Sequence, residues 1–268
     1  MKITTFEQIE QAMVAVSRAG VTLSVYIYFV DGLLIDTGPA RMAQRLRPLF
    51  SKWPIEQVLI THHHEDHTGL AHWLQQTKNV PIWMHAKGAE ICKKGARLPF
   101  YRNVFWGKYE PFEADRVGRT IETENYTFEV IDTPGHAEDH VVLYNRENGW
   151  LFSGDLYVTP TPKSSFKFES IPEMIISLEK VLTYDFDTVF CAHKGIVKNG
   201  KEAIRNKLHY LLQYEEKVLT LYERGMTPRE IQRELFPRRH PMHYLSFFEN
   251  SPRHFIESIL ASEKQMSS

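Results

Sequence analysis

Residues 61–69 read THHHEDHTG, and four of the chain's 13 histidines fall within positions 62–67. The apolar run at 58–60, directly before them, is typical of a short buried strand. If the backbone stays extended, His62 and His64 face the same way, and Asp66 and His67 can turn toward a second ion. Imidazole and carboxylate groups suit zinc, iron or manganese. The spacing predicts a metal site, with a histidine-rich solvent loop as the alternative.

Three further apolar runs end shortly before another candidate ligand. They are residues 128–131 before His136, residues 150–152 before Asp155, and residues 188–192 before His193. Taken singly, each candidate also has an ordinary interpretation as a turn, cap or core side chain. Side chains at strand ends can converge in one crevice while rigid strands hold them in place. The repetition therefore favours one shared site for these residues.

The first 200 residues show the pattern of an α/β domain. A strand at 24–30 is followed by Asp31-Gly32, a strong hairpin signal because both turn positions favour positive φ. Helical stretches lie at 40–50, 70–77 and 171–182, between the apolar runs. We therefore expect helices that cover the faces of a sheet, with the catalytic domain at residues 1–200.

The pattern changes after Gly200. Apolar residues recur at helical spacing between 201 and 224, and Gly225 is a good helix stop. Thr227 and Glu230 then form a capping box around the proline at N1 of a second helix. A last helix is expected after Pro252. Residues 201–268 are therefore predicted to form a small helical C-terminal region.

The composition is that of an ordinary globular protein. The 268 residues are 43% hydrophobic and 24% charged, and the formal net charge is -1, so bulk electrostatics indicate neither nucleic acid nor an anionic membrane as partner. Cys92 and Cys191 lie far apart, which favours two reduced thiols. The N-terminal segment lacks a secretory apolar core, and no run is long enough to span a bilayer. These features predict a cytoplasmic enzyme.

The motifs together resemble the metallo-β-lactamase superfamily. They lie in the family's order along residues 20–200: LIDTG at 34–38, THHHEDHTG at 61–69, TPGH at 133–136, SGD at 153–155 and AH at 192–193. The resemblance implies a four-layer αββα sandwich, in which two mixed sheets pack face to face with the site at one edge. Residues 201–268 would form a winged-helix-like appendage.

The resemblance also implies a ligand set for two divalent ions, foremost zinc, with iron or manganese as alternatives. His62, His64 and His136 would bind the first ion, and Asp66, His67 and His193 the second. Asp155 would bridge both. Such a pair activates a shared water or hydroxide, which Asp66 would also orient as a catalytic residue. His63 and Glu65 alternate away from the ligands and are not included.

Other residues have less specific signals. Asp36 would support the ligands by hydrogen bonding, or serve as a structural turn carboxylate. His140 would hydrogen-bond a ligand carboxylate, face the substrate or be a buried structural residue. Lys163 would contact an anionic substrate or lie in solvent. Residues 95–112 alternate aromatic and basic side chains, which is compatible with a lid over the pocket or with an amphipathic segment packed on the domain.

Within the superfamily, the sequence is most similar to the glyoxalase II-like and lactamase-β-like branch. This implies hydrolysis of a small ester, thioester or lactone by metal-bound hydroxide. Cleavage of RNA or another phosphodiester, with the basic run 238–240 as a local contact, and a non-heme di-iron redox protein are the alternatives. Leu70 and Lys194 stand where glycine is usual in the family, which leaves the substrate open. A small molecule is the expected partner, while RNA and a homodimer stay open.

Overall fold

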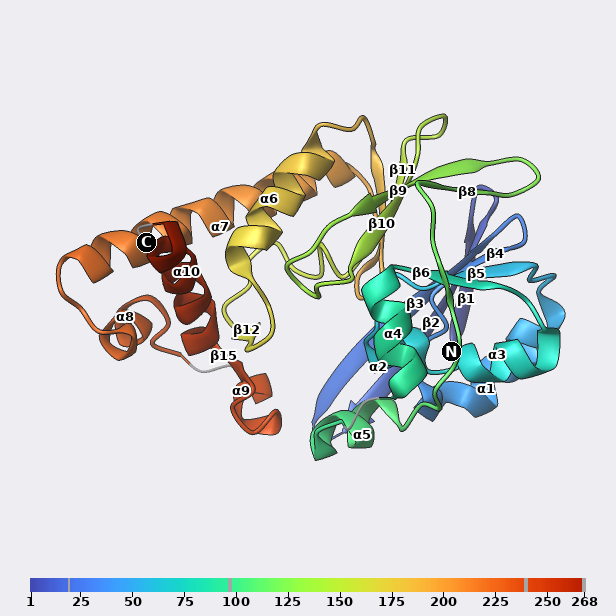
Figure 1. The fold of residues 1–268 in the computed structure, drawn as a ribbon, viewed down its shortest axis with the longest axis horizontal. Coiled ribbons are helices and arrows are strands. Elements are labelled where there is room, and N and C mark those ends of the chain that lie inside the picture. The colour runs from blue at the N-terminus through green and yellow to red at the C-terminus, as the bar shows by residue number, and fades with distance from the viewer. Residues whose placement is uncertain (19, 96–97, 239–240, 267–268) are drawn as a thin grey trace.

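Two β-sheets pack face to face in this protein, with helices on both outer sides (Figure 1). The structure is a computed structural model that describes residues 1–18, 20–95, 98–238 and 241–266. Both sheets contain parallel and antiparallel neighbours. The predicted αββα sandwich is confirmed.

The first sheet has seven strands in chain order, β1 to β7. They are β1 (Lys2–Phe6), β2 (Ile9–Arg18), β3 (Val21–Val30), β4 (Leu33–Ile35), β5 (Gln57–Leu59), β6 (Ile82–Met84) and β7 (Asp115–Arg116). The predicted hairpin joins β3 to β4, and Asp31 and Gly32 both have positive φ, at 47° and 81°. The outer face of this sheet is covered by η1 (Ala40–Met42), α1 (Ala43–Lys52), α3 (Ala71–Lys78) and α4 (Ala86–Lys94).

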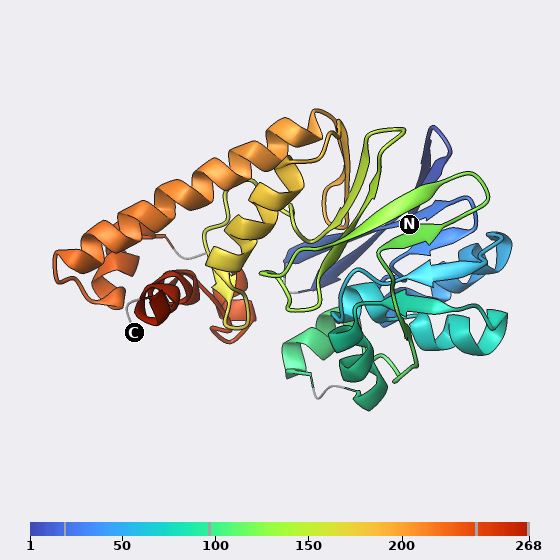
Figure 2. The ribbon, with the colours of Figure 1, turned by 45° about the horizontal axis from the view of Figure 1, so that its top comes forward.

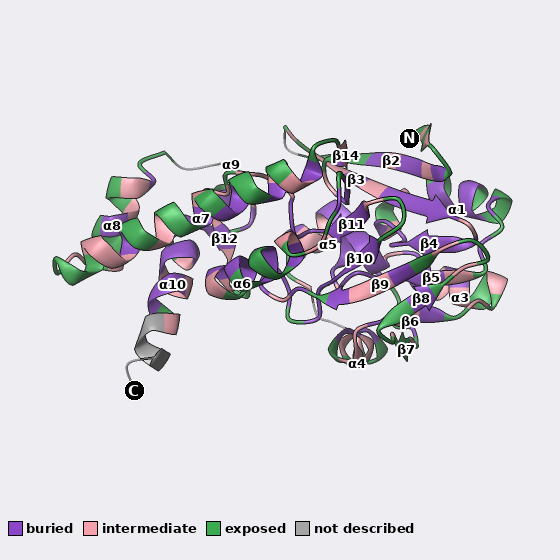
Figure 3. Cartoon of the chain, turned by 90° about the horizontal axis from the view of Figure 1, so that it is seen from above, coloured by how far each residue is buried: buried purple, intermediate pink, exposed green. Residues whose placement is uncertain are grey.

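The second sheet has six strands in the order β14-β13-β11-β10-β9-β8. They are β8 (Thr120–Glu122), β9 (Thr127–Asp132), β10 (Val141–Asn145), β11 (Trp150–Gly154), β13 (Thr188–Cys191) and β14 (Gly195–Val197). Every residue of β10, β11 and β13 is buried, because one face meets the first sheet and the other meets helices (Figure 3). Side chains on one face of these strands fill the space between the sheets, and those on the other face pack against helices.

Aromatic side chains fill the space between the sheets. Phe152 and Phe190 stack with ring centroids 4.5 Å apart, and Tyr28 from the first sheet meets both rings edge-on. Aliphatic residues of β4 and β5 complete this core. The two sheets are thereby fixed relative to each other, and so are the strand ends at the rim.

The C-terminal helices extend the outer helical layer of the second sheet (Figures 1 and 2). α6 (Ile171–Leu182) lies beside the long α7 (Gly200–Glu223), followed by α8 (Pro228–Leu235), α9 (Pro241–Leu245) and α10 (Pro252–Met266). Leu178, Leu211 and Phe255 share one apolar cluster with residues of β10, β11 and β13. The capping box of Thr227 and Glu230 is present. The domain boundary at residue 200 and the winged-helix likeness stay predictions.

A short two-stranded sheet connects the C-terminal region to the loop that follows β11. In it, β12 (Ser165–Phe166) pairs with β15 (Asn250–Ser251). The helix α5 (Phe100–Trp106) lies within the segment considered as a lid, of which residues 96–97 fall outside the described part of the chain. Among the described helices, none combines the length and apolarity that crossing a bilayer requires.

Phe152→Ala tests the contact between the sheets. Phe152 is 1% exposed and Phe100 is 76% exposed, so truncation of Phe152 leaves a cavity and is expected to lower the free energy of unfolding by about 3–5 kcal/mol. Phe100→Ala, the matched control, should change it by about 0.5 kcal/mol or less. Urea unfolding followed by fluorescence measures both values. Equal effects of the two changes would contradict this account of the core.

Candidate metal centre

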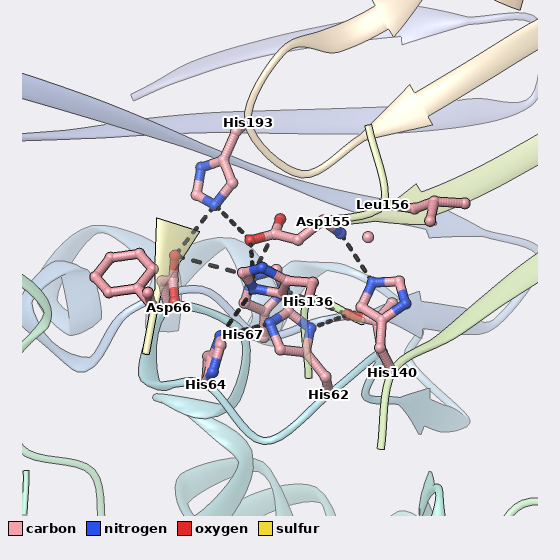
Figure 4. Close-up of polar contacts among 12 residues, drawn as sticks. His62, His64, Asp66, His67, His136, His140, Asp155, Leu156 and His193 are labelled. Atoms are coloured by element: carbon pink, nitrogen blue, oxygen red, sulfur yellow. Dashed lines mark hydrogen bonds and ion pairs between the residues drawn. The ribbon is translucent and has the colours of Figure 1, made fainter. Parts of the chain in front are cut away.

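The predicted ligands meet at one edge of the sandwich, where loops from both sheets end (Figure 4). His62 and His64 follow β5, and the short helix α2 (Glu65–Thr68) carries Asp66 and His67. The other three, His136, Asp155 and His193, follow β9, β11 and β13. The seven residues form three overlapping groups of three, and within each group the ligand atoms lie within 4.8 Å of one another, so that each group could hold an ion. The sequence placed every one of them at a strand end, and the structure brings them together there.

Three imidazole nitrogens converge on one point. His62 Nε2 lies 2.9 Å from His64 Nδ1, and His136 Nε2 lies 3.0 Å from the same atom. Burial and the neighbouring imidazoles lower the pKa values of His62 and His64 well below their usual range. Both rings are therefore neutral, which is the form that binds metal.

A second group of donors lies beside the first. His193 Nε2 is 3.3 Å from Asp66 Oδ2, and His67 Nε2 is 3.8 Å from that oxygen. Burial lowers the pKa of His67, but the carboxylates of Asp36, Asp155 and Asp66 outweigh it and raise the pKa well above its usual range. This side of the site is rich in negative charge, as a cation requires.

Asp155 lies between the two groups. Its Oδ2 is 3.3 Å from His136 Nε2 and 3.2 Å from His193 Nε2, while its Oδ1 is 3.6 Å from His67 Nε2. Asp155 Oδ1 and His67 Nε2 are both buried without a hydrogen-bond partner among the described residues. Buried polar atoms without a partner are costly. A divalent ion bound between these two donor atoms would satisfy both.

Acceptors behind the rings fix the tautomers. His136 Nδ1 donates to Glu169 Oε1 at 2.6 Å, His67 Nδ1 to Asp36 Oδ2 at 2.7 Å, and His193 Nδ1 to the Ser24 carbonyl at 2.7 Å. Because these oxygens accept, each Nδ1 carries a proton and each Nε2 is the ring atom that faces the centre. Despite burial, the nearby carboxylates raise the pKa values of His67 and His193, and a bound cation would displace the proton from their Nε2 atoms.

The carboxylate of Asp36 accepts hydrogen bonds from Thr61 at the start of the histidine-rich segment and from His67 on α2. It accepts hydrogen bonds from the Thr61 amide at 2.8 Å, from Thr61 Oγ1 at 3.0 Å and from His67. Thr61 Oγ1 in turn lies 3.1 Å from His62 Nδ1. Asp36 thus contacts one ligand directly and another through a hydroxyl, which matches the supporting role proposed from the sequence.

His140 and Lys163 lie in different surroundings. His140 is buried, its Nε2 accepts the amide hydrogen of Asp155 at 3.0 Å, and its Nδ1 lies 2.8 Å from Thr133 Oγ1. Burial and the charge of His136 lower the pKa of His140 to about 3, so it stays neutral. Of the three interpretations made from the sequence, a buried residue that holds the Asp155 backbone fits these contacts best. Lys163 is exposed and lines the cavity over the site.

The site opens into a cavity of about 750 Å³. One wall is α5, through Tyr101, Arg102, Phe105 and Trp106, and another is the segment from Val158 to Phe168. α5 therefore borders the cavity, as a lid would, while Phe105 and Trp106 also pack into the core beneath it. The lid function of residues 95–112 stays a prediction.

Three further residues near the site were not predicted from the sequence. Glu65 is buried and pairs with Arg102 of α5 at 2.8 Å, and Glu169 supports His136. Lys207 of α7 is also buried and reaches the loop after Asp155. Only Lys207 could have been found from the sequence, because it lies three residues after Ile204 on the apolar face of a helix, where a lysine is unusual.

Comparisons with known proteins identify the family to which the chain belongs. The family model described as "Metallo-beta-lactamase superfamily" matches residues 20–193. A hydroxyacylglutathione hydrolase of Idiomarina loihiensis is 30% identical, over 76% of this chain and 74% of the relative. A beta-lactamase-like protein 2 homolog of Drosophila melanogaster is 28% identical, over 71% of this chain. The chain spans 64% of the length of that relative.

Solved structures extend the likeness to the C-terminal helices. A metallo-beta-lactamase family protein from Thermus thermophilus superposes with a TM-score of 0.70 at 19% identity, over 97% of this chain and 95% of that one. A beta-lactamase domain protein from Burkholderia ambifaria also reaches 0.70, at 18% identity, over 96% and 88%. At such identities the likeness concerns the fold alone.

Asp36→Asn tests the support behind the ligands. The amide keeps the size of the carboxylate but places an N–H group among three donors, so His67 loses part of its orientation. Metal affinity is expected to fall by about 10–100-fold, measured by competition with a chromogenic zinc chelator. Asp115→Asn, at an exposed position of β7, is the control and should bind as the unchanged protein does. Unaltered affinity in Asp36→Asn would show that Asp36 is only a turn residue.

Proposed function

The chain belongs to the metallo-beta-lactamase superfamily, a superfamily of metallo-hydrolases, and we propose that it hydrolyses a small ester, thioester or lactone with two bound divalent ions. The observation that carries this proposal is the convergence of seven donor residues in three overlapping groups, with the carboxylate of Asp155 near both His136 and His193. Zinc is the metal we favour, because a set of imidazoles and carboxylates suits it.

Bound divalent ions would lower the pKa of a coordinated water toward ~7 and polarise the substrate carbonyl. The chain's own residues supply the rest. Burial raises the pKa of Asp66, but His67 and His193 outweigh it and lower the pKa below its usual range. Asp66 therefore stays ionised, and its Oδ2 can accept a proton from an attacking water and orient that water. The neutral His62 and His64 hold their lone pairs toward the first ion position.

The cavity favours a substrate with an apolar part. Leu23, Phe105, Trp106, Phe166 and Met174 line it, and apolar contact is the main source of small-molecule affinity. Lys163 and Lys194 also line it, and neither forms an ion pair with a described residue, so an anionic group on the substrate could find a partner there. The lysine contacts stay predictions.

We place a thioester first among the three substrate classes. The relatives include hydroxyacylglutathione hydrolases and an enzyme of Aspergillus fumigatus named atrochrysone carboxyl ACP thioesterase, which is 27% identical and of which this chain covers 58%. We do not extend the proposal to RNA, because none of the names of the relatives above refers to RNA, and the run 238–240 is described only at Arg238. The homodimer, the di-iron alternative and the cytoplasmic location stay untested predictions.

Metal analysis and a substrate panel test the proposal together. Protein purified without added metal should contain about two ions per chain by elemental mass spectrometry. Glutathione thioesters, aryl thioesters, lactones and phosphodiesters are then tested on protein loaded with zinc. Turnover of thioesters, lost on treatment with a chelator and restored by zinc, is the expected result. A reproducible absence of bound metal would contradict the central claim, and turnover of phosphodiesters alone would replace the substrate class.

Asp66→Ala tests the proton-accepting role. The change removes a ligand and the acceptor, so turnover should fall by about 100-fold or more, while circular dichroism should still report the native fold. Glu202→Gln is the control, because Glu202 is exposed and pairs with Arg205 on α7. Substantial activity in Asp66→Ala would mean that another group orients the attacking water.

A further inference from the structure

The segment that carries Asp155 has positive φ at both ends, and the backbone is unfavourable at the second of them. Gly154 has φ 45° and Val158 has φ 40°. Glycine adopts such angles without penalty, but a β-branched residue rarely does, because its side chain clashes with the backbone. Strained residues of this kind persist only where the surroundings hold them. The turn from Gly154 to Val158 therefore needs an external support.

Lys207 supplies a support from another part of the chain. It lies on α7 and is 3% exposed. Its Nζ donates to the carbonyl oxygens of Leu156 at 2.6 Å and Tyr157 at 3.0 Å. These are the first two residues after Asp155. The lysine thus connects the C-terminal helices to the loop that carries the bridging carboxylate.

An ammonium group at this position is costly. Burial lowers the pKa of Lys207 to about 8, although the carboxylates of Glu169 and Asp155 counteract part of that effect. No ion pair joins Lys207 to a described residue, so carbonyl oxygens are its partners. An apolar residue would satisfy the packing of Ile204 and Leu211 on the same face at lower cost. Packing alone therefore does not account for a lysine here.

We propose that Lys207 is a positioning residue for Asp155, which it holds between the two ion positions by fixing the carbonyl groups of Leu156 and Tyr157. His140 fixes the same segment from the other side through the Asp155 amide. The carboxylate of Asp155 lies 3.2–3.6 Å from three imidazoles, and a site of this kind tolerates errors of about 0.5 Å. The inference rests on the proposed two-metal function.

Lys207→Met tests the inference, because methionine keeps the apolar length and removes the donors. Zinc affinity, measured with a competing chelator, is expected to fall by about 10–100-fold. Hydrogen exchange of the amides at 155–158 in protein without added metal should become faster. Lys201→Met is the matched control, since Lys201 lies on the same helix and pairs with an exposed Asp185. It should alter neither measurement.

Val158→Gly provides a second test, which distinguishes positioning of Asp155 by Lys207 from a purely structural role of Lys207. Glycine removes the strain at φ 40°, so the loop depends less on its support. Val158→Gly in the Lys207→Met background should recover zinc affinity by about threefold or more. If Lys207→Met does not fold, Lys207→Gln, which keeps one donor, replaces it in both tests and should give the same direction.

The outcomes separate the two proposals. If the unchanged protein binds no zinc, the proposed function fails. If the unchanged protein binds zinc and Lys207→Met binds it equally tightly, only the role of Lys207 is overturned. A loss of global stability without a change in zinc affinity, or a loss of affinity that Val158→Gly does not relieve, would also overturn it and would leave Lys207 as a packing residue.

Discussion

The candidate site places imidazole nitrogens and carboxylate oxygens close together in a buried space at the edge of the sandwich. The rest of the structure must hold these donor atoms in place. Such an arrangement is unfavourable unless a cation is bound or the rings are held from behind. Asp36, Glu169 and the Ser24 carbonyl hold three rings by accepting their Nδ1 protons. The core of stacked aromatic residues between the sheets fixes the strand ends that carry the other donors. The fold therefore determines the directions in which these donor atoms point.

The sequence allowed the ligands and the fold class to be predicted, for a physical reason. A strand that ends at a ligand shows both its apolar run and its polar end locally, so His136, Asp155 and His193 could be recognised beside the histidines of residues 62–67. The contacts of Glu65, Glu169 and Lys207 could not be recognised in this way, although the position of Lys207 on the apolar face of a helix is itself unusual. Their roles depend on partners 37, 33 and 51 residues away, and a local pattern contains no information about such pairs.

The helix α5 shows how the cavity wall is attached to the rest of the protein. Arg102 pairs with Glu65 on the helix that carries Asp66 and His67, and the neighbouring Tyr101 donates a hydrogen bond to Glu249 near β15. Adjacent residues thus connect the wall to the metal-binding segment and to the C-terminal region. A substrate in contact with α5 would therefore touch a helix that is bonded both to the metal-binding segment and to the C-terminal region.

The pairing of β12 with β15 and the reach of Lys207 have a consequence for how this protein could change during evolution. Every candidate ligand lies before residue 200, yet Lys207 and Asn250 contribute to the lining of the cavity. A shorter gene that ended after β14 would encode all the donors but would lack one side of the cavity. The C-terminal helices could therefore not be exchanged between related genes without effect on the site, because their replacement would also replace part of the cavity wall.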